Sequence, residues 1–193
     1  MYVAIEGIDR SGKSTQIELL RRHFPNALFT KEPGGTELGE KIRAILLHGT
    51  PPAPLAELFL FLADRSEHIE KVIKPNLHRL IISDRSLISG IAYAKMKCNL
   101  DLEELFALNE LATEGIFPEK VVFLQLDERE LEKRYHNEEL DRIEKEGTSY
   151  LMRVQEAMKE ALFACGCEYI IIDAAKSKDE IFSEILAFVK GAP

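Results

Sequence analysis

The sequence has few cysteines and no long apolar run, and each shortage limits what the protein can be. Its three cysteines, Cys98, Cys165 and Cys167, are odd in number and lack the spacing of a zinc site. We therefore expect reduced thiols, with a redox role of the Cys165-Gly166-Cys167 segment as the alternative. No stretch approaches the roughly 20 apolar residues that a membrane-spanning helix needs, so we expect no membrane partner.

Basic residues are scarce relative to acidic ones. The 25 lysines and arginines are outnumbered by 33 aspartates and glutamates, which gives a formal net charge of −8. A surface of that sign repels nucleic acid and anionic lipid, so we expect no nucleic-acid partner. Anions must then be bound by a local group of cations, which makes the positions of the arginines informative.

The chain also lacks internal repeats, low-complexity linkers and a charged leader. Met1 is followed directly by Tyr-Val-Ala-Ile-Glu, with no cleavage site, so we expect no signal peptide and a cytoplasmic protein. Its 193 residues, of which 46% are apolar and 30% charged, suffice for one domain with a full hydrophobic core. We therefore predict a single domain over residues 1–193.

Short β-rich runs alternate with longer helical patterns along the chain. We expect five strands, at Tyr2–Glu6, Ala27–Thr30, Arg79–Ser83, Val121–Leu126 and Tyr169–Ile172. We expect helices at Lys13–Phe24, Thr36–Leu47, Leu55–Ile73, Ile88–Lys97, Leu102–Glu114, Glu128–Tyr135, Thr148–Cys165 and Lys178–Lys190. This alternation predicts an α/β fold, a five-stranded parallel sheet with helices on both faces, whose ligands bind beyond the carboxyl ends of the strands.

The first expected strand runs directly into a glycine-rich loop. The pattern G-x-x-x-x-G-K-[ST], between a strand and a helix, is fitted by Gly7, Ile8, Asp9, Arg10, Ser11, Gly12, Lys13 and Ser14. In this pattern the backbone N–H groups and the helix N-terminus bind phosphates, the lysine reaches the β- and γ-phosphates, and the serine ligates Mg²⁺. We therefore expect Mg²⁺ and ATP at this loop, with a chance glycine turn as the alternative.

The loop alone leaves the reaction open, because GTPases, motors, partition ATPases and small-molecule kinases share it. The sequence has no Asn-Lys-x-Asp motif of the kind that binds guanine, which argues against a GTPase. Large ATPase machines usually need a longer chain. A small-molecule kinase is therefore favoured.

Charged residues follow other expected strands too. Asp84 and Arg85 come after the third strand, where Asp84 is a candidate beside Mg²⁺ and Arg85 is either a phosphate ligand or a surface arginine. The second strand ends at the turn Pro33-Gly34-Gly35, and Thr36 is a candidate N-cap of the next helix. Arg43 lies two turns into that helix, and taken alone it fits a solvated surface arginine better than a site residue.

Two further segments have alternative interpretations. Phe61 and Arg65 share a helix face, either as a core aromatic with a surface ion pair or as an aromatic shelf beside a bidentate donor. The second arrangement suits a flat heterocycle with a carbonyl edge. The segment from Lys133 to Gly147 is the most charged in the chain, and it is either a solvated loop or a mobile lid that brings Arg142 onto a transferring phosphoryl group.

Five motifs occur in order along nearly the whole chain. They are Glu6 through Thr15, Glu32 through Thr36, Phe61-x-x-x-Arg65, Asp84-Arg85-Ser86, and Asp141 through Glu144. A chain with these motifs resembles thymidylate kinase (dTMP kinase) of the P-loop nucleoside-monophosphate kinases. The resemblance implies one kinase domain with a lid near residues 134–147, a homodimer, and transfer of the γ-phosphoryl group of ATP to dTMP in dTTP biosynthesis.

Two alternatives to this function remain open. One is a kinase for another acceptor, such as dUMP, dCMP or a deoxynucleoside. The other is a nucleotide-binding switch or regulatory ATPase that acts through a partner, which would hydrolyse ATP slowly and would not bind dTMP.

The resemblance also implies roles for individual residues. It implies that dTMP is bound by Asp9, Glu32, Pro33, Arg43, Phe61, Arg65, Arg85, Ser89, Gly90 and Tyr93. It implies that ATP is bound by residues 7–14 together with Thr15, Arg134, Asp173 and Ala174, and Mg²⁺ by Ser14, Asp9 and Asp84. Within these sets Phe61 would stack on thymine, Arg65 would hydrogen-bond its edge, and Tyr93 would crowd out a 2′-hydroxyl.

The resemblance also implies which residues stabilise the negative charge during phosphoryl transfer. They are Arg10, Lys13, Arg85 and Arg142. Some relatives have glycine at the position of Arg10 and supply a catalytic arginine from the lid, whereas others have a basic residue in the loop. Residues 136–140 lack the added arginines of the lid type, so we expect Arg10 to carry this role. Ser86 departs from the family pattern, because many relatives have Tyr or His there.

Overall fold

The computed structural model describes residues 1–134 and 147–191, which fold around one parallel sheet. Its strands are β1 (Tyr2–Glu6), β2 (Leu28–Lys31), β3 (Ile81–Asp84), β4 (Lys120–Gln125) and β5 (Glu168–Asp173). They lie in the order β2-β3-β1-β4-β5, and every neighbouring pair is parallel. The predicted α/β class and five-stranded parallel sheet are therefore confirmed.

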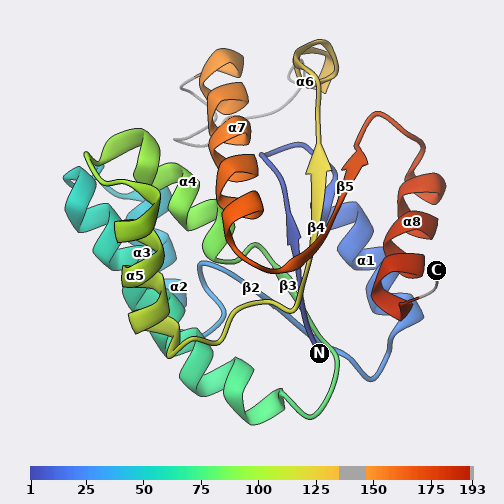
Figure 1. Cartoon of the computed structure of the whole chain (residues 1–193), viewed down its shortest axis with the longest axis horizontal. Coiled ribbons are helices and arrows are strands. Elements are labelled where there is room, and N and C mark those ends of the chain that lie inside the picture. Colours follow the sequence, from blue (N-terminus) through green and yellow to red (C-terminus); the bar gives the residue numbers. More distant parts are fainter. Residues whose placement is uncertain (135–146, 192–193) are drawn as a thin grey trace.

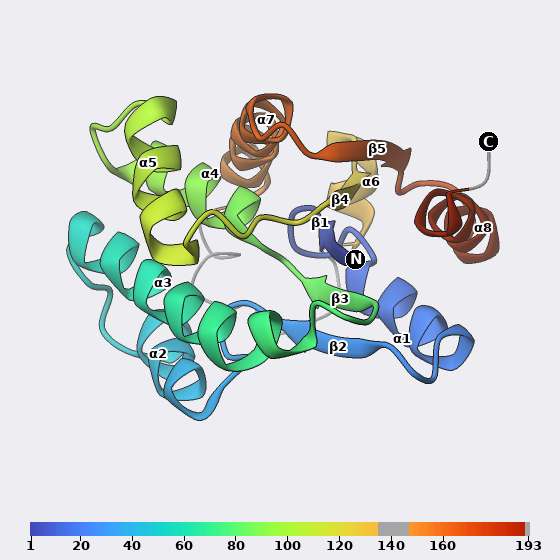
Figure 2. The ribbon, with the colours of Figure 1, turned by 60° about the horizontal axis from the view of Figure 1, so that its bottom comes forward.

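Helices cover both faces of this sheet (Figures 1 and 2). One face carries α1 (Lys13–His23) and α8 (Lys178–Lys190). The other carries α2 (Glu37–His48), α3 (Pro54–His68), α4 (Leu87–Lys97), α5 (Leu102–Thr113) and α7 (Thr148–Ala164). The short helix α6 (Glu128–Arg134) stands at the carboxyl end of β4.

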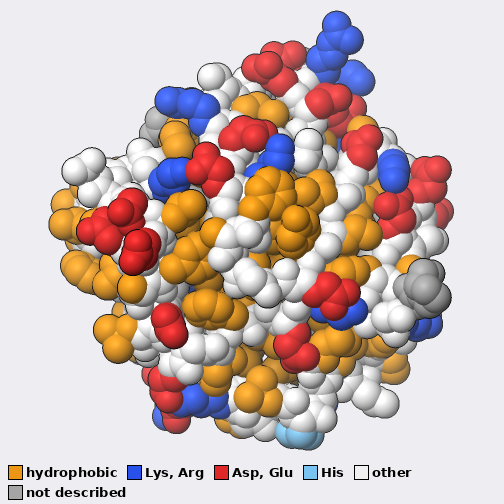
Figure 3. Space-filling model, viewed as in Figure 1, with side chains coloured by type: hydrophobic (Ala, Val, Ile, Leu, Met, Phe, Trp, Pro, Cys, Tyr) orange, Lys and Arg blue, Asp and Glu red, His pale blue; other side chains and the backbone are white. Residues whose placement is uncertain are grey.

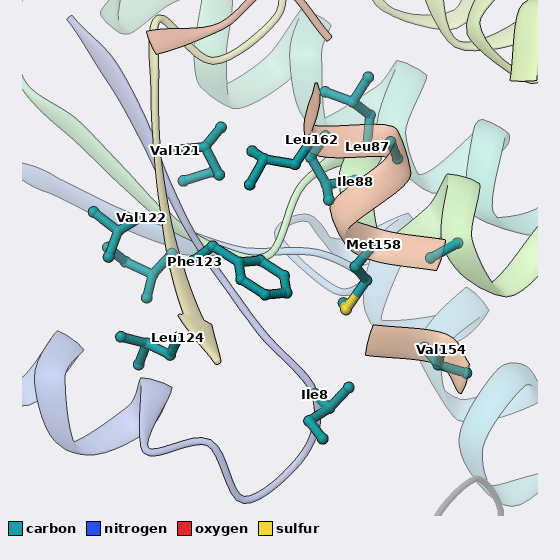
Figure 4. Close-up of a cluster of buried hydrophobic side chains, with 14 of the residues drawn as sticks. Ile8, Leu87, Ile88, Val121, Val122, Phe123, Leu124, Val154, Met158 and Leu162 are labelled. Atoms are coloured by element: carbon teal, nitrogen blue, oxygen red, sulfur yellow. The ribbon is translucent and has the colours of Figure 1, made fainter. Parts of the chain in front are cut away.

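The core is centred on β4, whose four middle residues are fully buried. Figure 4 shows Val121 and Phe123 on the side of the strand that faces α7, with Phe123 reaching toward Met158. Val122 and Leu124 point to the opposite side, as the period of two in a strand requires. Because both faces are covered, the four middle residues of the strand are all apolar rather than alternating with polar ones.

The helix expected over residues 55–73 is helical over its whole length, but its last five residues do not form a regular α-helix. The α-helix ends at His68, and the chain continues as one π-helical turn, Ile69–Ile73, and one 3₁₀ turn, Lys74–Asn76. Pro75 has no N–H to donate and cannot extend a regular helix. The wide turn keeps Ile69 and Ile73 buried against Tyr2 in a second, smaller apolar cluster.

The expected cap of α2 is confirmed. The Thr36 side-chain oxygen accepts a hydrogen bond from the Gly39 N–H at 2.9 Å, which satisfies one of the otherwise unpaired donors at the helix start. This cap fixes the beginning of the helix that carries Arg43.

Surface charge on the described residues agrees with the composition. On the face in Figure 3, acidic and basic side chains are interspersed, with apolar side chains between them and no broad basic area. Within residues 1–134 and 147–191, no helix combines the length and the apolar character that crossing a bilayer requires. The predicted lid, including Arg142, falls almost wholly on residues 135–146, outside the described part.

Candidate active site

The candidate site forms where the carboxyl ends of β1 and β3 lie side by side. The two strands pair with Ile5 opposite Asp84, and the Arg85 N–H donates to the Ile5 carbonyl at 3.0 Å. Because β1 lies between β3 and β4, the strand order reverses here, and ligands of open α/β sheets bind at such a point. The loop after β1 and the turn after β3 therefore face each other.

Glycine is required at both ends of the loop after β1. Gly7 has φ +146°, and a Cβ added to it would lie 2.6 Å from the Leu124 carbonyl oxygen. Gly12 has φ +95° and immediately precedes α1. Only glycine adopts these backbone angles without strain, so the local geometry fits a phosphate-binding loop at a helix N-terminus.

Lys13 folds back into this loop. Its Nζ donates to the carbonyl oxygens of Gly7 at 3.0 Å and Ile8 at 2.9 Å. Burial, reinforced by the charge of Arg85, lowers the pKa of Lys13 to about 8. Both acceptors are neutral carbonyls, and the Asp9 carboxylate that pairs with Nζ lies 4.0 Å away, so an arriving phosphate offers the ammonium group a closer charged partner.

Arg10 joins the loop to the end of α6. Its Nη1 donates to the Arg134 carbonyl oxygen at 2.7 Å, and Nη1 of Arg134 donates to the Arg10 carbonyl oxygen at 2.9 Å. Nη2 of Arg134 also donates to the Ala174 carbonyl oxygen at 2.7 Å. Three predicted ATP-binding segments, the loop, α6 and the turn at Asp173 and Ala174, are therefore brought together.

Arg85 faces the phosphate loop and is not the surface arginine weighed as an alternative. Its Nη1 donates to the Gly7 carbonyl oxygen at 3.1 Å and to Ser89 Oγ at 2.9 Å, and its Nη2 pairs with the Asp9 carboxylate. Its backbone lies at φ +71°, which a residue with a side chain rarely adopts and which often marks a functional site.

The carboxylates of Asp9 and Asp84 have different surroundings. Burial alone would raise the pKa of Asp9, but the charges of Arg85 and Lys13 outweigh it and hold that pKa below its usual value. Oδ1 of Asp84 is buried and accepts no hydrogen bond from any described residue. A buried carboxylate oxygen without a partner is costly, so Asp84 is ready to accept a ligand.

Ser14, Asp9 and Asp84 line one cavity with an empty volume of about 1200 Å³, which is partly open to solvent. Among the described residues there is no group of three or more His, Cys, Asp or Glu that could hold a metal by itself. This donor set fits Mg²⁺, which is usually bound by one or two carboxylates together with phosphate oxygens and water.

A second cavity, with an empty volume of about 520 Å³, adjoins the first. It contains all ten residues predicted to bind the acceptor, together with Leu47 and Ser86. The two cavities share Asp9, Glu32, Arg43 and Arg85.

Arg65 forms a buried ion pair at the wall of this second cavity, not the surface ion pair weighed as an alternative. Nε of Arg65 donates to Glu32 Oε2 at 2.8 Å, and both side chains are only 4% exposed. His68 contacts the other Glu32 oxygen at 2.9 Å. Burial would raise the pKa of Glu32, but Arg65 and His68 hold it below its usual value.

Arg43 is also a wall residue, which overturns its interpretation as a solvated surface arginine. Its side chain is half-buried, and Nη1 donates to the Pro33 carbonyl oxygen at 2.9 Å. The capped start of α2 therefore directs this guanidinium toward the cavity that Phe61 and Tyr93 also line.

Glu6 supports the site in a way that its place in the phosphate-loop motif does not predict. Its buried Oε1 accepts hydrogen bonds from the Ser86 N–H at 2.7 Å and the Ser86 hydroxyl at 2.8 Å. Its Oε2 accepts from the hydroxyl of Ser89, which in turn accepts from Arg85. Burial raises the pKa of Glu6, although the charge of Arg85 opposes the shift. The position of this carboxylate at the end of a buried strand is the feature of the sequence that could have indicated such a role.

Comparison with known proteins agrees with the site. The family model described as thymidylate kinase matches residues 5–185. The chain is 52% identical over 187 residues to a thymidylate kinase of Wolinella succinogenes, with 97% of each chain covered. It is 50% identical over 186 residues to one of Sulfurimonas denitrificans, with 96% of this chain and 97% of the relative covered. A crystal structure of thymidylate kinase from Ehrlichia chaffeensis matches with a TM-score of 0.78 at 27% identity, with 98% of each chain covered.

Proposed function

This chain belongs to the thymidylate kinase family, and we propose that its two adjoining cavities hold the two nucleotides of the reaction. The enzyme transfers the γ-phosphoryl group of ATP to dTMP and yields ADP and dTDP. The observation that carries the proposal is the set of four residues common to both cavities, because phosphoryl transfer needs donor and acceptor phosphates side by side.

The 520 Å³ cavity is the proposed dTMP site. Phe61 stacks on the thymine ring and Arg65 donates to its edge. Arg85 and Arg43 bind the acceptor phosphate, and Asp9 binds the 3′-hydroxyl. Residues around the base and sugar complete the site, namely Glu32, Pro33, Ser89, Gly90 and Tyr93.

The phosphate loop is the proposed ATP site. Its N–H groups, Thr15 and the N-terminus of α1 bind the phosphates, and Lys13 binds the β- and γ-phosphates. Arg134 with the turn at Asp173 and Ala174 forms the adenine side, which is supported by the hydrogen bond between Arg134 and the Ala174 carbonyl.

Ser14, Asp9 and Asp84 are the proposed holders of Mg²⁺, supported by the buried Asp84 oxygen without a hydrogen-bond donor among the described residues. When bound, the ion neutralises phosphate charge.

The chain's own cations lower the cost of bringing two anionic nucleotides together. Two like charges repel strongly in a partly buried cleft unless cations lie between them. Lys13, Arg85 and Arg10 supply such charge, and Arg142 stays a prediction because it lies outside the described residues. A general base is not required, because the acceptor phosphate is already ionised near pH 7. The protein therefore acts by positioning and by stabilising charge.

The assignment of the two cavities is tested with Phe61→Ala. We expect the KM for dTMP to rise about tenfold or more while the KM for ATP changes little, since stacking is lost only in the acceptor cavity. A panel of dTMP, dUMP, dCMP and thymidine, followed through ADP release, defines the acceptor range. An equal rise of both KM values would contradict the assignment.

A homodimer is also proposed, as the resemblance implied. Four large apolar side chains on α2 and α3 are about half exposed, namely Leu38, Ile45, Leu55 and Phe59. Such a group is typical of an interaction surface. The lid over residues 134–147 and the cytoplasmic location stay predictions from the sequence.

A further inference from the structure

We propose that Asn109 is a positioning residue, which fixes the Arg65 guanidinium in the orientation that recognises the acceptor base. The proposal rests on the proposed role of Arg65 in the dTMP site. Asn109 lies on α5, outside every motif of the sequence analysis, and its side chain is fully buried. Asn109 has no role in the proposed binding of phosphate or of Mg²⁺.

The orientation of the Asn109 amide is determined by its two contacts. Its Nδ2 donates to the Leu105 carbonyl oxygen at 2.7 Å, one turn earlier on the same helix. Since a carbonyl can only accept, the amide nitrogen must point there, and Oδ1 must point the other way. Oδ1 accepts from Nη1 of Arg65 at 2.6 Å. The helix therefore presents a fixed acceptor to the guanidinium.

Three separate segments hold the guanidinium of Arg65. Glu32 accepts from Nε, Asn109 from Nη1, and the Ser86 carbonyl from Nη2 at 3.2 Å. These bonds, within the described part of the chain, engage three of the five N–H donors of a guanidinium. Glu32 supplies the opposite charge for Arg65. Asn109 is neutral, and its hydrogen bond fixes the rotation of the guanidinium plane. The N–H donors that are not engaged in these bonds remain for a base.

Gly90, on α4, lies next to the guanidinium of Arg65. A Cβ added at Gly90 would lie 2.7 Å from Nη2 and 3.1 Å from Nη1 of Arg65. Glycine at this position therefore leaves the space that the guanidinium occupies, and any side chain there would displace it. Asn109 and Gly90 thus act on the same group from two different helices.

A guanidinium presents donors only, which sets the class of base that it accepts. A pyrimidine with a carbonyl oxygen at the position facing Arg65 can accept a hydrogen bond. A pyrimidine with an amino group there presents a second donor and leaves buried groups unsatisfied, which is strongly unfavourable. We infer that Asn109 contributes to the preference for dTMP over dCMP through Arg65.

The test compares one substitution of Asn109 that lacks an acceptor oxygen with one that keeps it. Asn109→Leu removes both amide groups at similar size. Asn109→Asp keeps an oxygen facing Nη1 of Arg65, but it also loses the Nδ2 donor to Leu105 and adds a negative charge. For N109L we expect the KM for dTMP to rise about tenfold or more, because a hydrogen bond to a charged group is lost. The preference for dTMP over dCMP should fall, while kcat and the KM for ATP should stay within about threefold. N109D should keep more of the dTMP affinity and of the preference than N109L, because an oxygen still accepts from Nη1 of Arg65.

Thr113→Val is the matched control. Thr113 is buried one turn further along α5, its hydroxyl donates to the Asn109 carbonyl oxygen at 2.9 Å, and it lies on the same helix face. A merely structural role of this face would make T113V and N109L behave alike. Wild-type acceptor preference in folded N109L, or an equal loss in N109D, would overturn the proposal.

Should N109L fail to fold, Asn109→Ala removes the same oxygen. N109D must then keep more of the preference than N109A. Failure of the proposed function is distinguishable, because it would appear as absent dTMP turnover in the wild-type enzyme.

Discussion

Arg10 and Arg134 hydrogen-bond to each other's backbone carbonyl oxygens, at 2.7 and 2.9 Å. The phosphate loop and the last residue of α6 are therefore joined directly, across 124 residues of sequence. The guanidinium of Arg10 lies beside the cavity that contains Lys13 and Ser14. A guanidinium at this place can exchange a neutral carbonyl for a charged phosphoryl oxygen, which is the stronger acceptor.

We expect Arg10→Ala to lower kcat at least about a hundredfold, with only a modest change in the affinity for ATP. An arginine that binds the transferring group stabilises charge that develops in the transition state, and such groups are worth about 10³–10⁵ in rate. Steady-state kinetics with saturating dTMP measures this. The control is Arg22→Ala, because Arg22 is exposed on α1 and pairs only with Glu18 among the described residues. A near wild-type rate in R10A would refute the role.

Lys13 should make ATP binding depend on pH above about 8. Its pKa in the ligand-free protein is lowered to about 8, by burial first and then by Arg85. Bound phosphates favour the ammonium form and raise that pKa. Below pH 8 the lysine is charged in both states, so affinity is constant. Above it, binding must take up a proton, and the Kd for ATP should rise by up to about tenfold per pH unit.

Calorimetry between pH 7 and 9.5, in buffers of different ionisation enthalpy, measures both the Kd and the proton uptake. Cys165→Ser is the control, because a hydrogen bond with Cys167 lowers the pKa of the Cys165 thiol to about 7. That thiol lies beyond the amino end of β5, away from the phosphate loop. A Kd that stays flat to pH 9.5 would contradict the protonation of Lys13 as the cause.

Gly90→Ala should weaken dTMP binding and leave ATP binding nearly unchanged. The added methyl group would lie 2.7 Å from Nη2 of Arg65, which is held from other sides by Glu32 and Asn109. Either the guanidinium or α4 must move, and each change distorts the acceptor cavity. We expect at least about a tenfold rise in the KM for dTMP, since small displacements in a binding site have large effects.

Thermal shift separates this effect from unfolding. A millimolar ligand with micromolar Kd stabilises by roughly 4 kcal/mol, so loss of the shift with dTMP but not with ATP is the expected result. Gly115→Ala is a control of similar chemistry, because Gly115 lies in an open turn where no atom is within 4 Å of an added Cβ. Since Gly115 has φ +73°, that control reports the cost of backbone strain alone.

The sequence predicted those parts of the site that are set by backbone geometry and by contiguous motifs. The loop at residues 7–14 needs glycine at fixed positions, and Arg85 follows a strand whose end had to lie at the ligand edge of the sheet. Eight of the ten predicted acceptor residues lie at a strand end or on a helix that follows one, whereas Phe61 and Arg65 lie on α3, which follows α2.

Glu6 opens the phosphate-loop motif, but the motif does not predict its hydrogen bonds to Ser86 and Ser89. Asn109 could not be recognised in this way, because it is a single polar residue whose role depends on a distant partner. Leu105, Asn109 and Thr113 recur at intervals of four, which places them on one face of α5, and all three are buried. A polar residue on an apolar helix face indicates that its side chain has a hydrogen-bond partner, but the sequence does not show which residue that partner is. The partner, Arg65, lies 44 residues away.

The change from α-helical to π-helical geometry after His68 could not be predicted for a related reason. Ile69 and Ile73 continue the apolar period of a helix, so periodicity favours one long helix. The packing of both side chains against Tyr2 is a tertiary contact, and it is satisfied by a π-helical turn instead.

The last prediction concerns the half-exposed apolar side chains of α2 and α3. Phe59 is 57% exposed on α3, and Leu55 lies one turn before it. If two copies of the chain pack through these helices, Phe59→Glu places a charge in the interface, where burial without a partner is costly. We expect the wild type to sediment as a dimer at micromolar concentration and F59E to shift toward the monomer. Phe163→Glu is matched in exposure at 57% but lies near the end of α7, so it should stay dimeric. A wild-type monomer, or a dimer unaffected by F59E, would exclude this surface as the interface.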